Sequence, residues 1–413
     1  MKYGCIGEHL THSFSKEIHN ALTDYEYDIL EIPKEKLSDF AKNKNFSAIN
    51  VTIPYKEQIM PYMYYIDAHA KEIGAVNTVV NRSGKLYGYN TDFHGMKELI
   101  SHAGIQIENK KVVILGTGGT SKTALAVAKA LLAKDIIRVS RSSREDAVSY
   151  ETLYEKHSDA DVIINTTPCG MFPNISGSAV DISKFKNLSG VIDAVYNPLR
   201  TSIILDAKKR GIAAEGGLYM LVSQAVRASE IFIDTAYPKT ETERIFKKII
   251  KEKENIVLIG MPASGKTTVG NILAQKMNRE IIDTDELIIK GEGKSIPDIF
   301  NERGEEYFRR VESEIIEEVS AKTGVIISTG GGAVLNADNV NSLKKNGTVY
   351  FLDRPLESLM PTSDRPLAST RAAIEKRYNE RYSIYTSSAD IIIDASCDAD
   401  EVAEKIERNF TND

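Results

Sequence analysis

Residues 255–275 contain a glycine-rich turn with the spacing of a nucleotide-binding loop. An apolar run leads into Gly260-Met-Pro-Ala-Ser-Gly-Lys-Thr267, the complete Gly-x-x-x-x-Gly-Lys-Thr pattern. In that pattern backbone N–H groups surround the phosphates of ATP or GTP, the lysine reaches the terminal phosphates and the threonine hydroxyl ligates Mg²⁺. We therefore expect phosphoryl transfer or hydrolysis, with Lys266 catalytic and Thr267 on the metal. The expected nucleotide-binding residues are Ala263, Ser264, Gly265, Lys266, Thr267 and Thr268.

Charged residues downstream of this loop could bind the metal and a small anionic acceptor. Asp283 and Asp285 end the next apolar run, so one carboxylate can serve the metal and the other an acceptor hydroxyl. A lone arginine is more often the partner in a surface ion pair. Several arginines beside a phosphate-binding loop favour an anion pocket and a lid arginine. The candidates are Arg309, Arg310, Arg365 and Arg381, with the glycine run Gly330–Gly332.

A second glycine-rich turn, at Gly116, Gly118 and Gly119, also lies between an apolar run and a helix-like stretch. Glycines there let the backbone approach a diphosphate, which the following helix N-terminus would stabilise. A packing turn without a ligand is the alternative. The next apolar run ends in Ser140-Arg141-Ser142-Ser143-Arg144, without the acidic residue of an NAD site. Because a guanidinium suits a 2′-phosphate, we expect NADP and hydride transfer.

The pattern of apolar runs indicates an α/β protein. Between residues 110 and 394 these runs lack polar alternation, as parallel strands covered on both faces do. They span 110–116, 135–140, 161–167, 190–196, 255–260, 280–285, 324–329, 348–353 and 389–394. Before residue 100 the runs alternate more, and one predicts a hairpin turning at residues 82–85. A lysine-rich helical stretch, 241–255, precedes the second glycine-rich strand, so we place the module boundary near Lys251–Glu254.

Composition excludes several classes of protein. The chain has 413 residues, enough for two to three domains, and its 52 basic and 58 acidic side chains give a net charge of −6. Nucleic-acid binding would require an excess of positive charge. No apolar run approaches the length of a membrane helix, and the N-terminal residues do not resemble a secretory signal. Three distant cysteines exclude a disulfide framework, so we expect a cytoplasmic enzyme acting on small molecules.

With these residues identified, two families can be recognised. Residues up to about 250 resemble shikimate dehydrogenase, through motifs that include IGEHLTHSFSKEIHN (6–20), INVTIPYKE (49–57), GYNTDFHG (88–95) and DAVYNP (193–198). Residues 255–413 resemble shikimate kinase, through GMPASGKTT, DTDELI, GEEYFRRVE, STGGGAV, DRPLA and RYSIY. The chain therefore looks like a bifunctional fusion. The resemblance implies reduction of 3-dehydroshikimate to shikimate with NADPH, then phosphorylation of shikimate to shikimate 3-phosphate with MgATP.

The dehydrogenase resemblance assigns roles by matching motifs. Lys56 and Asp92 match the catalytic pair, and a lysine ammonium can protonate the alkoxide that ketone reduction leaves. The matched substrate-binding residues are Ser13, Ser15, Thr52, Lys56, Asn77, Asp92, Tyr196 and Gln224. The matched NADP-binding residues are Gly116, Thr117, Gly118, Gly119, Thr120, Ser140, Arg141, Ser142, Ala194 and Gly217.

The kinase resemblance makes Asp285 the residue that orients or deprotonates the shikimate hydroxyl, and puts Asp283 on the Mg²⁺ side. Arg309, Gly331 and Arg381 match the residues that hold shikimate, and Arg365 matches the catalytic lid arginine that closes on ATP. Many family members have a longer lid that begins with an arginine, whereas here the stretch is LMPTSDRPLA.

The implied architecture has three parts. A substrate lobe comprises residues 1–97 and 222–250, and a Rossmann-like NADP lobe comprises residues 98–221. A linker, 251–254, joins them to a P-loop kinase domain with a parallel sheet, residues 255–413. Two alternatives remain: an NAD-dependent quinate/shikimate dehydrogenase, which Arg141 disfavours, and a catalytically inactive ligand-sensing module in one half.

Overall fold

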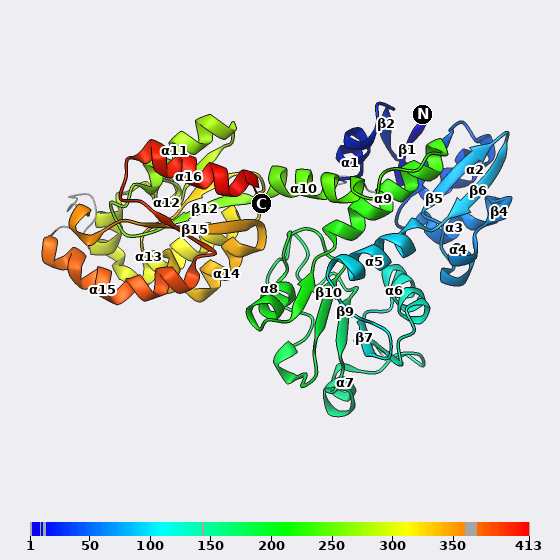
Figure 1. Cartoon of the computed structure of the whole chain (residues 1–413), viewed down its shortest axis with the longest axis horizontal. Coiled ribbons are helices and arrows are strands. Elements are labelled where there is room, and N and C mark those ends of the chain that lie inside the picture. The colour runs from blue at the N-terminus through cyan, green and yellow to red at the C-terminus, as the bar shows by residue number, and fades with distance from the viewer. Residues whose placement is uncertain (1, 9, 11–13, 143, 360–369, 413) are drawn as a thin grey trace. The chain divides into compact units, whose positions relative to one another are not determined.

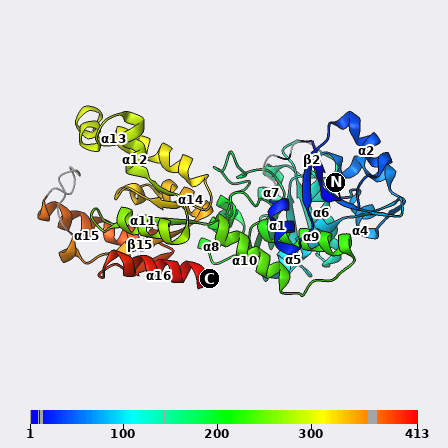
Figure 2. The same ribbon diagram turned by 90° about the horizontal axis from the view of Figure 1, so that it is seen from above.

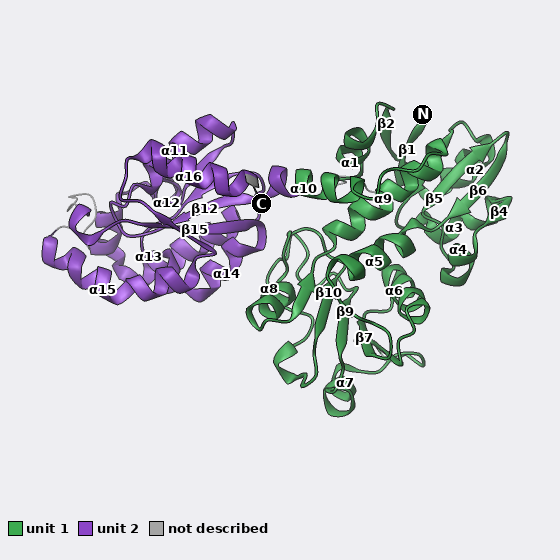
Figure 3. Ribbon diagram, in the orientation of Figure 1, with its two compact units in different colours: residues 1–249 green, residues 250–413 purple. Residues whose placement is uncertain are grey.

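The computed structural model describes residues 2–8, 10, 14–142, 144–359 and 370–412. They form two compact units, Met1–Ile249 and Ile250–Asp413 (Figure 3). Helix α10 (Glu241–Lys253) includes residues 251–253 of the predicted linker as its last turn. Apolar residues recur at helical spacing in this stretch, and Ile245, Phe246 and Ile249 are buried, as on the inner face of an amphipathic helix.

The first unit begins with a mixed six-stranded sheet of order β2-β1-β3-β5-β6-β4. Strand β1 is parallel to β2 and β3, and β5 is antiparallel to β3 and β6. The strands are β1 (Tyr3–Gly7), β2 (Tyr27–Glu31), β3 (Ala48–Val51), β4 (Tyr65–Ile66), β5 (Thr78–Arg82) and β6 (Lys85–Tyr89). The predicted hairpin is confirmed: Arg82 pairs with Lys85, and Ser83 and Gly84 both have positive φ, as a two-residue β-turn requires. The helices are α1 (Ser15–Leu22), α2 (Leu37–Asn43), α3 (Tyr55–Gln58) and α4 (Ala68–Ile73).

A second sheet of the first unit is wholly parallel, with order β11-β10-β9-β7-β8. Its strands are β7 (Lys111–Leu115), β8 (Asp135–Val139), β9 (Val162–Asn165), β10 (Gly190–Asp193) and β11 (Ala213–Glu215). Successive residues of β7 enter opposite cores, Val112 and Ile114 on one face and Val113 and Leu115 on the other. This explains the absence of polar alternation, because both faces are covered by helices. The helices are α5 (Thr91–His102), α6 (Gly119–Ala130), α7 (Tyr150–Lys156), α8 (Ser202–Lys209) and α9 (Leu218–Ile233).

Helices α5 and α9 pack closely on each other where the two sheets meet (Figure 1). Met96 and Leu99 of α5 enter the core of the parallel sheet. Ala228 and Phe232 of α9 pack against β1 and β3 of the mixed sheet. The cleft between the sheets is therefore bordered by the N-termini of both helices.

The second unit has one parallel sheet of order β13-β14-β12-β15-β16. Its strands are β12 (Asn255–Ile259), β13 (Ile281–Asp283), β14 (Ile326–Ser328), β15 (Gly347–Asp353) and β16 (Ile391–Asp394). Helices α11 and α16 cover one face, and α13, α14 and α15 cover the other (Figure 1 and Figure 2). The helices are α11 (Lys266–Met277), α12 (Thr284–Glu292), α13 (Ile296–Ser320), α14 (Ala337–Asn346), α15 (Arg371–Ser388) and α16 (Ala399–Asn412).

One local detail of this unit differs from the sequence-based expectation. The run 280–285 is not all strand, because β13 ends at Asp283 and Asp285 lies in the first turn of α12. The carboxylate of Asp283 caps that helix, accepting from the backbone N–H of Asp285 at 3.0 Å. Helix α13 is interrupted at Gly304, whose φ of 81° is not helical. Among the helices of the described residues, none is long and apolar enough to cross a bilayer.

Candidate active sites

The first unit contains a pocket of about 610 Å³ between its two sheets. The mixed sheet contributes residues that follow β3 and β5, and the parallel sheet contributes the loop after β10 and the start of α9. Ten of the residues predicted from the sequence line it: Ser15, Thr52, Lys56, Asn77, Asp92, Thr120, Ala194, Tyr196, Gly217 and Gln224. The fold thus brings the predicted substrate groups and part of the predicted dinucleotide site to one cavity. Ser13 lies outside the described residues.

Lys56 and Asp92 meet at the wall of this pocket. Lys56 lies on α3, directly after the loop that follows β3, and Asp92 lies in the first turn of α5. The Lys56 Nζ is 2.6 Å from Asp92 Oδ2, and the side chains are 26% and 17% exposed. Both groups therefore remain accessible from the pocket, and a substrate oxygen can replace the water that would otherwise solvate the ammonium group.

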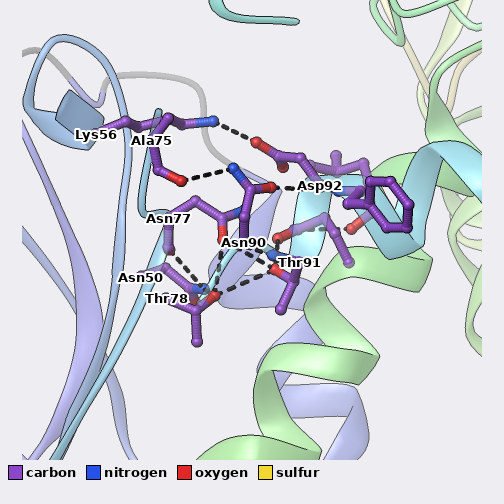
Figure 4. A network of polar contacts seen from close by, with 11 residues as sticks. Asn50, Lys56, Ala75, Asn77, Thr78, Asn90, Thr91 and Asp92 are labelled. Carbon is purple, nitrogen blue, oxygen red and sulfur yellow. Dashed lines mark hydrogen bonds and ion pairs between the residues drawn. The ribbon is translucent and has the colours of Figure 1, made fainter. Parts of the chain in front are cut away.

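A buried hydrogen-bond network fixes the segments that carry this pair (Figure 4). The Asn77 side-chain oxygen accepts from the Thr91 backbone N–H at 2.8 Å and from the Thr78 hydroxyl at 3.0 Å. Asn90 donates to the Ala75 carbonyl at 2.9 Å and also caps α5 through the N–H of Phe93. Because Asp92 directly follows these residues, the network sets the position of its carboxylate. The sequence motif alone did not indicate that Asn77 serves this network as well as the pocket.

Tyr196 and Gln224 also line the pocket. Burial raises the pKa of the Tyr196 phenol, so it is a hydrogen-bond donor at neutral pH. Gln224, on α9, donates to the Leu221 carbonyl at 2.9 Å, and its side-chain oxygen is 3.3 Å from the Thr91 hydroxyl. Cys5 also lines the cavity, and burial raises its pKa to about 12, which keeps it a neutral thiol.

One carboxylate behind this wall was missed by the sequence analysis. Asp193, at the end of β10, is fully buried. It accepts from Asn165 at 2.9 Å, from the Val195 backbone N–H at 3.0 Å and from the Thr201 hydroxyl at 2.6 Å. It therefore fixes the loop that contains Ala194 and Tyr196. It is the first residue of the DAVYNP motif and a charged residue at the end of an otherwise apolar strand, but the sequence analysis assigned it no role.

The predicted dinucleotide loop lies between β7 and α6. Gly116 has a φ of 104°, and a Cβ there would lie 2.9 Å from the Thr166 hydroxyl, so a glycine is required. A Cβ added to Gly118 or Gly119 would meet no atom within 4 Å. Within the described part of the chain no side chain caps α6, so its first N–H groups are available to a diphosphate.

Basic residues follow the neighbouring strand β8. Arg141 is exposed, and the hydroxyls of Ser140 and Ser142 lie 3.2 Å apart beside it. Arg138, which the sequence analysis did not select, pairs with Asp146 and reaches the carbonyl of Thr117 in the glycine-rich loop at 3.5 Å. Arg138 lies within strand β8, and the sequence pattern of a dinucleotide site predicts a ribose contact only from residues after the end of that strand.

The second unit contains the other glycine-rich loop, between β12 and α11. The Lys266 ammonium group is buried and donates to the carbonyls of Gly260 and Met261, both at 3.0 Å. Ala263 and Gly265 have positive φ values of 65° and 92°. This geometry produces the concave backbone of a phosphate-binding loop. Ser264 is buried within the loop and Thr268 is exposed in the first turn of α11.

The predicted metal ligands meet at the same edge of the sheet. The Thr267 hydroxyl is 2.7 Å from Asp283 Oδ2, and the Ser328 hydroxyl donates to the same oxygen at 3.0 Å. A hydroxyl and a carboxylate beside a phosphate-binding loop are suitable ligands for Mg²⁺. Ser328, at the end of β14, was not selected from the sequence.

The predicted acceptor residues surround the glycine run after β14. A Cβ added to Gly330 would lie 2.6 Å from Asp285 Oδ1, and one added to Gly332 would lie 2.1 Å from Arg309 Nη1. The side chains of Asp285 and Arg309 therefore pack directly against the glycine run. The carbonyl of Gly331 accepts from Arg381 at 3.1 Å and from the Tyr385 hydroxyl at 2.5 Å. Asp285, Arg309, Gly331 and Arg381 therefore converge from four elements.

A buried carboxylate, Glu312, orients the arginine of this cluster. Glu312 is 1% exposed and accepts from Arg309 Nη1 at 2.7 Å. Burial raises the pKa of Glu312, and the adjacent Arg309 opposes that shift. Arg310 takes no part, because it points outward and pairs with the exposed Glu314. The lid arginine, Arg365, lies outside the described residues.

Comparisons with known proteins cover both units. Family models match the shikimate dehydrogenase substrate binding domain over residues 5–79 and shikimate kinase over residues 262–411. A relative from Clostridium perfringens (strain SM101 / Type A), "Shikimate dehydrogenase (NADP(+))", is 37% identical over 265 residues, covering 60% of this chain and 97% of the relative.

Solved structures give the same result for the first unit. A chorismate mutase/shikimate 5-dehydrogenase fusion protein from Clostridium acetobutylicum is 38% identical, with a TM-score of 0.57, over 60% of this chain and 96% of that one. Shikimate dehydrogenase 1 from Peptoclostridium difficile is 37% identical, with a TM-score of 0.55, over 60% of this chain and 98% of that one. The chain therefore belongs to the shikimate dehydrogenase family through its first unit, and it carries a shikimate kinase domain in its second.

Proposed function

We propose that the chain catalyses two consecutive reactions, the NADPH-dependent reduction of 3-dehydroshikimate to shikimate and the MgATP-dependent phosphorylation of shikimate to shikimate 3-phosphate. The observation that carries the proposal is the presence of both reactive sets in one chain. Lys56 and Asp92 pair at the wall of a cavity, and Lys266, Thr267 and Asp283 surround a phosphate-binding loop. A sensing module would not need either set intact.

In the first unit, bound NADPH would supply the hydride that adds to the ring carbonyl carbon. The Lys56 ammonium group, at hydrogen-bond distance from the carbonyl oxygen, would donate a proton to it as negative charge develops. Asp92 holds the ammonium group in position, and Tyr196 and Gln224, which line the same pocket, would orient the ring. The open space at Gly118 and Gly119 and the exposed Arg141 fit a dinucleotide with a 2′-phosphate.

In the second unit, bound MgATP would supply the transferred phosphoryl group. Arg309, Arg381 and the backbone of Gly331 would hold the shikimate carboxylate, because charge-assisted hydrogen bonds select that group. Asp285 would orient the attacking hydroxyl, and Thr267 and Asp283 would hold Mg²⁺. Lys266 would neutralise charge on the terminal phosphates, and positioning together with neutralisation is most of what this reaction requires.

One incubation tests the proposal. Purified full-length protein is given 3-dehydroshikimate, NADPH and MgATP, and the products are identified by mass. Shikimate 3-phosphate is the expected product. Conversion to shikimate alone would retain the dehydrogenase half and reject the kinase half. No conversion would reject the dehydrogenase half, and supplied shikimate with MgATP would then test the kinase half separately.

Matched variants then assign each step to its unit. Lys56→Met is expected to abolish reduction while supplied shikimate is still phosphorylated, and Lys266→Met is expected to make shikimate accumulate. If either variant retained the activity assigned to its own site, that assignment would be wrong.

A further inference from the structure

A cationic side chain lies beside the phosphate-binding loop of the second unit and has no role in the reaction as argued so far. Arg354 directly follows β15, the strand that pairs with β12. Its Nη1 is 3.8 Å from the position that a Cβ would occupy on Gly265, the glycine that precedes Lys266. Apart from Gly265 and its two chain neighbours, no other heavy atom of the described residues is within 4 Å of that position. The guanidinium group therefore borders the loop directly.

The hydrogen-bonding capacity of Arg354 is not used within the described part of the chain. Its Nε is buried and has no hydrogen-bond partner there. The adjacent carboxylate, Asp353, instead accepts from the Tyr382 hydroxyl at 2.9 Å. A buried guanidinium N–H without an acceptor is costly unless a ligand supplies one.

The order of the strands indicates which part of a nucleotide Arg354 can reach. The metal-side groups Asp283 and Ser328 end β13 and β14, on one side of β12. Arg354 follows β15, on the other side of β12. A phosphate chain bound along the loop, with its transferred group near the metal and Asp285, would direct its nucleoside end toward β15. Arg354 is thus placed for the phosphates that remain with the nucleotide.

We propose that Arg354 is a nucleotide-binding residue that hydrogen-bonds the non-transferred phosphates of ATP and ADP from the β15 side. The inference rests on the proposed kinase function, whose loop supplies the other contacts. A charged hydrogen bond of this kind corresponds to about 10- to 100-fold in affinity. Because the contact is the same before and after transfer, it should affect binding rather than the chemical step.

The test compares Arg354→Met and Arg354→Lys with Arg408→Met in the full-length protein. Arg408 is an exposed arginine of α16 that pairs with Glu404, so its loss controls for removing a surface guanidinium. We expect Arg354→Met to raise the KM for ATP about 10- to 100-fold, with kcat and the KM for shikimate changed less than about threefold. Arg354→Lys should recover part of the loss, because it keeps the charge but not the planar donor group. The dehydrogenase rate of each variant checks that the chain is folded.

Product inhibition provides a second readout that a structural role would not affect selectively. In the kinase assay, inhibition by ADP should weaken in Arg354→Met in proportion to the KM for ATP, while inhibition by adenosine should not change. An unchanged KM for ATP would overturn the inference, and so would equal loss of ADP and adenosine inhibition. A fall in kcat at unchanged KM would also overturn it, because it would place Arg354 on the transferred group. None of these outcomes bears on the proposed kinase function, which fails only if the unsubstituted protein does not phosphorylate shikimate.

Discussion

The ammonium nitrogen of Lys56 lies 2.6 Å from Oδ2 of Asp92, although the two residues are 36 positions apart. One is on the short helix after β3 and the other in the first turn of α5. The buried amides of Asn77 and Asn90 tie the start of α5 to residues 75–77, and the backbone N–H of Val76 donates to the carbonyl of Lys56 at 2.8 Å. The pair is therefore preorganised before substrate binds, which electrostatic catalysis requires.

Loss of the Lys56 ammonium group should reduce the dehydrogenase reaction and leave the kinase unaffected. We expect Lys56→Met to lower kcat for 3-dehydroshikimate about 10²- to 10⁴-fold, because Lys56 is the cation among the described residues that line the pocket. Steady-state NADPH oxidation measures the effect. Lys71→Met, an exposed lysine of α4, is the control and should retain the wild-type rate. The double variant Lys56→Met/Asp92→Asn should lose much less activity than the product of the two single losses. Losses that multiply would show that the two residues act independently.

Arg141 should determine the preference between the two nicotinamide cofactors. Arg141→Ala removes the exposed guanidinium group expected to bind the 2′-phosphate, so the KM for NADPH should rise about 10- to 100-fold. The KM for NADH should change little, because that cofactor lacks the phosphate. Parallel assays with both cofactors give the ratio, and Arg210→Ala, at an exposed arginine after α8, is the control. An equal rise for both cofactors would contradict a specific phosphate contact.

Gly332 should be required for the position of Arg309. A Cβ on Gly332 would lie 2.1 Å from Arg309 Nη1, while its φ of −108° is accessible to alanine. Gly332→Ala should therefore fold normally but displace the guanidinium, raising the KM for shikimate about tenfold or more. Gly291→Ala is the matched control, since a Cβ there meets no atom within 4 Å. If Gly332→Ala left the KM for shikimate unchanged, Arg309 would not be a substrate ligand.

Ionisation of Asp193 should make the segment 190–205, from β10 to the first turn of α8, less stable as the pH rises. Burial raises the pKa of Asp193 from 3.8 to about 6, opposed by its hydrogen bonds to Thr201, Val195 and Asn165. Since the folded pKa is higher than the unfolded value, the stabilising contribution is fully present below about pH 4 and is lost as the pH rises through about 6. The loss amounts to about 3 kcal/mol.

Hydrogen exchange of peptides from residues 190–205, corrected for intrinsic rates, can detect this change between pH 4.5 and pH 7. Protection should fall in the unsubstituted protein and change much less in Asp193→Asn, which is neutral throughout. Asp181→Asn alters an exposed carboxylate and should retain the wild-type pH dependence. The same pH dependence in Asp193→Asn would assign the effect to another group.

Local sequence determined the secondary structure near both glycine-rich turns. The runs 110–116 and 255–260 became β7 and β12, followed by helices that begin at Gly119 and Lys266. Unbroken apolar runs encode strands buried on both faces, and the glycines encode the turns, so these features depend on adjacent residues alone. The family motifs extended that information to the residues that line each site.

Tertiary structure alone decided which distant groups complete the sites. Asp193 meets Asn165 and Thr201, Glu312 orients Arg309, and the Arg354 guanidinium borders Gly265. Asp193 and Glu312 lie within family motifs, but those motifs do not say which partners the side chains meet, and a charged residue at a strand end or on a helix is usually exposed to solvent. Each gains its role from burial and from partners brought close by the sheet order. That proximity depends on the packing of the whole unit, which no short stretch of sequence specifies.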